Sequence, residues 1–243
     1  VTHPVLAEAV TQFQAQAYKE LLPADGPVRA QIMGALTPEK QDQAHRVKDF
    51  MNYQLMDQMK EYEPEFDQML FYLPLTGSTF KKVYYDELLG RAVSKFIQAE
   101  DLIVPYTASS LEDADAIVHV IKISENDLRK QQVGGFYRDI ELGDPPINES
   151  QIKTKQLELE GVTANDQQRE SMYTLLEVHT DLDLEDYPDV NENEEPTGIK
   201  LPYIITIDET SQQVLSIRRN YEPEDPLKKK KNYFVQFKFL PGT

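Results

Sequence analysis

The chain has 243 residues and a formal net charge of -17, from 42 acidic and 25 basic side chains. This acidic surplus argues against a general nucleic-acid-binding surface, because neutralising phosphates requires lysine and arginine. Cysteine is absent, which excludes disulfides, a thiol nucleophile and cysteine-based metal sites. No apolar run reaches the roughly 20 residues of a membrane helix, so we expect no membrane partner. The first residue is Val1 and not Met, and we expect a piece of a longer protein.

The first part of the chain carries helical signals, because apolar residues recur every three or four positions. Thr37 has the side chain of an N-cap residue, and Pro38 suits the first position of a helix. Helices are therefore expected over residues 5–21, over 38 to about 62, and from about 67 to Pro74 or Gly77.

From Phe80 the apolar period changes to two, which predicts strands. These are expected over residues 80–85, 92–97, 102–104, 117–123, 174–184, 203–207, 214–218 and 233–240. Short helices are expected at 109–113, from Ser124 to Gly134, at 149–160 and at 166–172. Helices followed by antiparallel strands and hairpins predict an α+β fold.

The charge is unevenly distributed and suggests a division into three parts. Residues 1–138, helices followed by antiparallel strands, carry a net charge of -6. Residues 139–198 hold 17 acidic and 3 basic side chains, a net charge of -14. Residues 199–243, a hairpin and a final strand, carry +3. The acidic block is either a solvated insertion or a surface that repels DNA or meets a basic partner.

The sharpest candidate for catalysis is the set His179, Asp181 and Asp183. A period of two places these side chains on one strand face, where they could hold a divalent ion for a metal-dependent hydrolase. The alternative, which we favour, is the solvated face of a half-buried strand. The buried face of that strand would then carry Leu176, Val178, Thr180, Leu182 and Leu184.

Other catalytic patterns are missing. Gly77-Ser78 lacks the surroundings of a nucleophile elbow, and Gly134-Gly135 lacks the remaining glycines of a dinucleotide loop. His45 lies on a charged helix face and His119 within an apolar strand, so both are interpreted as structural. We expect no catalytic residue, no metal and no cofactor.

One dense basic cluster stands near the end of the chain. It is either a solvated loop that protects strand ends or a docking site for an acidic surface, such as the 139–198 segment of a neighbouring copy. As candidate subunit-interface residues we take Arg218, Arg219, Lys228, Lys229, Lys230 and Lys231.

Several stretches resemble the portal proteins of tailed bacteriophages, in the branch typified by short-tailed phages. One is Arg46-Val47-Lys48-Asp49-Phe50-Met51-Asn52-Tyr53-Gln54-Leu55, and another is Leu176-Glu177-Val178-His179-Thr180-Asp181-Leu182-Asp183-Leu184. The likeness covers nearly the whole chain in the expected order. The remaining matched stretches are residues 2–9, 12–15, 73–78, 80–86, 100–106 and 198–203.

The resemblance implies a structural subunit of a ring, usually of twelve copies, at one vertex of the virion capsid, assembled in the host cytoplasm. Double-stranded DNA would enter and leave through the channel without specific binding, while the terminase large subunit hydrolyses ATP. Further partners would be the major capsid protein and tail or adaptor proteins. The matched part is similar to the wing region, with the stem, clip and crown expected in sequence beyond Thr243.

The acidic composition agrees with this expectation, because a channel protein with a net negative charge does not bind the phosphates of the DNA that passes through it. Two other classes stay open at this point. One is the metal-dependent hydrolase built on His179, Asp181 and Asp183, and the other is a generic acidic interaction domain.

Overall fold

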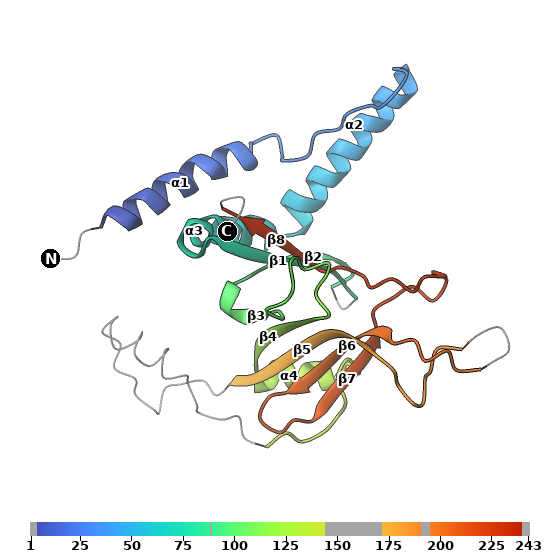
Figure 1. The fold of residues 1–243 in the computed structure, drawn as a ribbon. Helices are drawn as coiled ribbons and strands as arrows, with labels where there is room; N and C mark the ends of the chain where they lie inside the picture. The colour runs from blue at the N-terminus through green and yellow to red at the C-terminus, as the bar shows by residue number, and fades with distance from the viewer. Residues whose placement is uncertain (1–3, 88, 144–171, 191–194, 240–243) are drawn as a thin grey trace. The chain divides into compact units, whose positions relative to one another are not determined.

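The computed structural model describes residues 4–87, 89–143, 172–190 and 195–239. It confirms the α+β fold: helices are combined with two antiparallel sheets (Figure 1). The chain forms two compact units. Unit 1 comprises Val1–Glu100 and Asn232–Thr243, and unit 2 comprises Asp101–Lys231.

These units do not follow the three-part division drawn from charge and element order. Residues 1–138 are split between the units near residue 100, and residues 199–243 are split at 231–232. The reason is strand pairing, because the last strand of the chain pairs with the first, which is far away in sequence. The distribution of charge along the chain does not predict such a pairing.

The helices of unit 1 follow the predicted order. They are α1 (Val5–Leu21), α2 (Pro38–Tyr53) and α3 (Tyr62–Thr76). The hydroxyl of Thr37 accepts a hydrogen bond from the backbone N–H of Lys40 at 3.4 Å, which confirms the N-cap. The second helix was predicted to continue to about residue 62, but it passes into a π-helical turn, Gln54–Gln58, and helical geometry ends before Met59. Pro74 lies inside α3, which ends at Gly77 with a φ of 76°.

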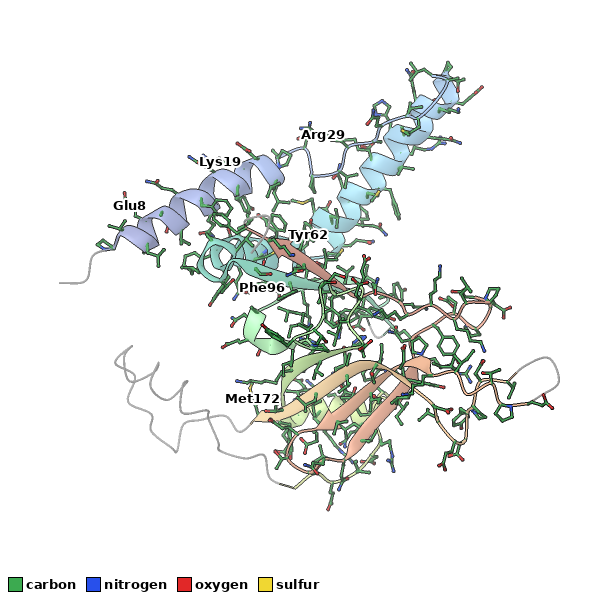
Figure 2. All side chains as sticks on the ribbon, viewed as in Figure 1. Glu8, Lys19, Arg29, Tyr62, Phe96 and Met172 are labelled. Carbon is green, nitrogen blue, oxygen red and sulfur yellow. The ribbon has the colours of Figure 1, made fainter. Side chains whose placement is uncertain are left out.

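The sheet of unit 1 has the order β2-β1-β8. It consists of β1 (Ser78–Asp86), β2 (Arg91–Ile97) and β8 (Phe234–Lys238), with both neighbours antiparallel to β1. Helix α3 contacts β1 and β2, and α1 packs against α3. Leu22, Phe66, Met69 and Leu70 form the core between these elements, and Tyr62 and Phe96 pack against it (Figure 2).

The sheet of unit 2 has the order β3-β4-β5-β6-β7, all antiparallel. Its core contains Tyr173, Leu175 and Leu215, over which Leu128 of the helix α4 and Tyr137 pack. The element bounds are β3 (Leu102–Ile103), β4 (Ala116–Ser124), α4 (Glu125–Val133), β5 (Met172–Leu182), β6 (Leu201–Asp208) and β7 (Val214–Arg219), with a 3-10 turn at Ala99–Asp101 before β3.

Two predicted local elements of this region have different outcomes. Ser124 caps α4 as predicted, accepting a hydrogen bond from the N–H of Asp127 at 3.2 Å. The helical turn predicted at 109–113 is wrong: the hydroxyls of Ser109 and Ser110 donate to the carboxylate of Asp113, which holds a bend instead. The helices predicted at 149–160 and 166–172 lie outside the described residues, apart from Met172, which begins β5.

Candidate functional surfaces

The strand β5 carries the proposed metal ligands, and its buried face is the opposite of the predicted one. Tyr173, Leu175, Glu177 and His179 are buried, whereas Leu176 and its alternate neighbours are only half-buried. Both faces of β5 carry apolar residues, and β5 lies between β4 and β6 in the middle of the sheet. Apolar alternation alone therefore could not identify the face against which α4 packs.

The side chains proposed to bind a metal do not come together. Nε2 of His179 donates a hydrogen bond to Oε1 of Glu177 at 2.7 Å, and the two side chains are only 7% and 8% exposed. Asp181 is exposed at the end of the strand, and Asp183 lies beyond it. Within the described ranges, no three His, Asp or Glu side chains are placed to hold a metal ion.

A row of polar residues instead crosses the buried face of this sheet. Glu177 lies opposite His119 of β4 and opposite Thr206 of β6. Directly opposed residues in an antiparallel pair project to the same face. The hydroxyl of Ser216 on β7 donates to that of Thr206 at 3.2 Å, so the row reaches the edge strand. The hydrogen bonds from His179 to Glu177 and from Ser216 to Thr206 both lie within the sheet, as a structural role requires.

The basic cluster is largely engaged within unit 2. The ammonium group of Lys228 forms an ion pair with Asp189, whose carboxylate is buried and also accepts a hydrogen bond from Thr197 at 2.6 Å. Lys230 donates to the carbonyl of Ala114 at 2.9 Å. A further ion pair, of 2.5 Å, joins Lys231 to Glu222.

The remaining three residues of the cluster lie in different surroundings. The guanidinium of Arg218 lies 4.2 Å from the ring centroid of Phe136, a cation–π contact. Arg219 lies opposite Tyr203 at the end of β7, and the backbone N–H of Lys229 donates to Asp225 at 3.1 Å. Lys228 of the basic cluster thus pairs with Asp189 of the acidic 139–198 segment within one chain.

Sequence reasoning did not single out Lys81, which is the most unusual charged residue of unit 1. It is only 4% exposed, and its Nζ lies 4.6 Å from the ring centroid of Tyr62 and 5.1 Å from that of Phe66. Burial lowers the pKa of Lys81 to about 8, against the opposing effect of Glu65 and Glu61. No motif marks this position; only the packing of α3 on β1 creates it.

The helix α2 has no buried residue. Val47, Phe50 and Met51 are exposed apolar side chains on it, and they fall within an arc of about 100° at helical spacing. The segment before the helix, residues 30–36, adds Met33 and Leu36. This segment and α2 line an open hollow of about 540 Å³, formed by Ala30, Gln31, Ile32, Leu36, Gln41, Ala44, His45 and Lys48.

The base of α2 is fixed by hydrogen bonds. Oδ1 of Asn52 accepts from the backbone N–H of Val28 at 2.9 Å, and its Nδ2 donates to the carbonyls of Val28 and Asp25 at 3.3 and 3.5 Å. Gly26 has a φ of +90°, and a Cβ there would lie 2.4 Å from Asn52. Only glycine fits this close approach.

No family model matches the chain, and no curated protein matches it. Among the described residues, no helix is long and apolar enough to span a membrane.

Proposed function

We propose that the chain is the wing-side part of a bacteriophage portal subunit, which assembles into a ring around the DNA channel of the capsid. The observation that carries this proposal is the ordered resemblance to short-tailed-phage portal proteins across nearly the whole sequence. Residues 46–55 and 176–184 are the longest of the matched stretches.

The fold is compatible with this proposal. The matched stretches contribute to elements of both units: residues 80–86 belong to β1, residues 100–106 include β3, and residues 176–184 include most of β5. If the resemblance were confined to one short motif, the matched residues would instead lie together in a single site. A structural role is also supported by β5, where the buried His179 bonds to Glu177 within the sheet.

The charge supports passage of DNA without retention. A net charge of -17 repels phosphates, and three lysines of the densest basic cluster bind groups of their own unit. In the proposed role the terminase large subunit supplies the energy, and the portal contacts the major capsid protein and tail or adaptor proteins in the virion. The portal itself then needs no catalytic group.

Native mass spectrometry of the full-length protein tests the proposal. A portal subunit gives one high-order ring, with twelve copies expected, and negative-stain images of the same sample show a central channel. A protein that stays monomeric or dimeric at micromolar concentration contradicts the proposal and favours a generic acidic interaction domain.

A further inference from the structure

The helix α2 and residues 30–36 before it, together called the α2 arm, expose apolar side chains that no part of the described structure buries. The exposed fractions are 54% for Val47, 57% for Phe50, 43% for Met51, 85% for Met33 and 68% for Leu36. Tyr53, at the end of α2, is 51% exposed as well. Isolated apolar residues on a surface are ordinary, but six on one arm amount to a patch.

The size of this patch matches that of a protein interface. The exposed fractions of the five side chains other than Tyr53 correspond to roughly 550 Å² of apolar surface. A standard interface covers about 800 Å² on each partner, of which about 57% is apolar, or roughly 450 Å². The α2 arm therefore carries enough apolar surface for one side of such an interface.

The arm is also pre-organised. Asn52 bonds to the backbone on both sides of Gly26 and fixes the turn that leads into residues 30–36. Thr37 caps the start of α2. Helices in proteins gain most of their stability from tertiary packing, and α2 has no buried residue. Fixing its two ends lowers the entropy that is lost when a partner binds.

The charge of the arm favours a second copy of the chain as the partner. Two copies that each carry -17 repel one another, chiefly through residues 139–198, which hold -14 of that charge. Residues 30–53 carry no net charge, because three acidic side chains are balanced by three basic ones. The balanced set comprises Glu39, Asp42, Asp49, Lys40, Arg46 and Lys48. Two like-charged copies can therefore meet at this neutral, apolar surface at low electrostatic cost.

We propose that the α2 arm packs onto a neighbouring copy of the same chain. The proposal rests on the portal function above and names one of its contact surfaces. In a ring each subunit uses two different surfaces, since the contact is head-to-tail. The arm is one of these surfaces, and Val47, Phe50 and Met51 form its apolar centre.

Substitution on the two sides of α2 tests the inference in the full-length protein. Val47→Asp and Met51→Asp place a charge in the apolar patch, and we expect the protein concentration at half-assembly to rise at least tenfold. His45→Asp is the matched control, since it introduces the same charge at an exposed residue at least about 120° around the helix from Val47, Phe50 and Met51, and it should assemble normally. None of the three residues is buried, so melting temperatures should be unchanged.

Cross-linking supplies a second measurement. Because these 243 residues contain no cysteine, a Val47→Cys substitution places a photoactivatable cross-linker at one defined position among them, and the full-length protein without this substitution is the control for labelling elsewhere. We expect adducts between copies, and fewer of them when the Met51→Asp substitution is added.

The outcomes separate this inference from the portal proposal. If the wild-type protein forms a ring and Val47→Asp assembles equally well, the arm inference is overturned and the portal proposal stands. If the wild type forms only a small oligomer that Val47→Asp dissociates, the arm inference stands and the portal proposal fails. A monomeric wild type without cross-linked adducts contradicts both.

Discussion

Replacing Lys81 with methionine should stabilise unit 1 at neutral pH and remove a specific pH dependence. The lysine is buried between α3 and β1, and the pKa of its ammonium group falls from 10.5 to about 8. A difference of about 2.5 units corresponds to about 3 kcal/mol of unfavourable burial of the charged form. The cation–π contacts with Tyr62 and Phe66 are lost with the charge and offset part of the gain, by about 1 kcal/mol. Lys81→Met should therefore be more stable by about 2 kcal/mol at pH 7.

The pH dependence follows from the direction of the shift. The folded lysine releases its proton near pH 8, whereas the unfolded lysine holds it until about 10.5. The unfolded state thus binds more protons in this window, and stability rises with pH. Between pH 7 and pH 9 the increase contributed by Lys81 is about 1.3 kcal/mol. Above pH 10 the pKa of Tyr18, raised to about 12 by its hydrogen bond to Glu63, opposes the trend.

Urea unfolding followed by far-UV circular dichroism at pH 7, 8 and 9 measures these differences. The wild type should gain stability relative to Lys81→Met as the pH rises, so the advantage of the variant shrinks. Lys95→Met is the control, because Lys95 is an exposed residue of β2, and it should follow the wild type at each pH. Parallel pH profiles for Lys81→Met and the wild type would refute the reasoning.

Three further predictions concern unit 2. Lys228→Ala should lower its stability by about 1–3 kcal/mol, because the buried carboxylate of Asp189 loses its ion pair; Lys229→Ala, measured in the same thermal scans, should change it by less than about 0.5 kcal/mol. His179→Ala should cost about 2–4 kcal/mol, since it removes a buried side chain and its hydrogen bond to Glu177; a neutral result would show that the pair is not structural. Calorimetric titration with Mn²⁺ or Zn²⁺ should show no binding tighter than about micromolar, and tighter binding lost on Asp181→Ala would restore the hydrolase hypothesis.

Much of the fold could be predicted from local signals. Thr37 and Ser124 mark helix starts because their hydroxyls satisfy backbone N–H groups that the helix leaves free. The change of apolar period near Phe80 likewise marks the passage from α3 to β1. These features depend on neighbouring residues alone, so they can be predicted directly from the sequence.

Features that depend on distant residues could not be predicted in the same way. Nothing local to β8 shows that it pairs with β1 and so returns to unit 1. The buried face of β5 depends on where α4 packs, and the alternation of Leu176 and Val178 indicated the wrong side. The partner of Lys228 is Asp189, 39 positions away in the chain. The lysine run was predicted to be either a solvated loop or a docking site, and no local signal in it indicates this internal ion pair.

The central claim is that this chain belongs to a ring-forming portal subunit, and the number of copies in the native assembly tests it most directly. Native mass spectrometry of the full-length protein should give a single high-order species, with twelve copies expected, that persists on dilution to about micromolar concentration. A monomer or a small oligomer under these conditions would contradict the claim.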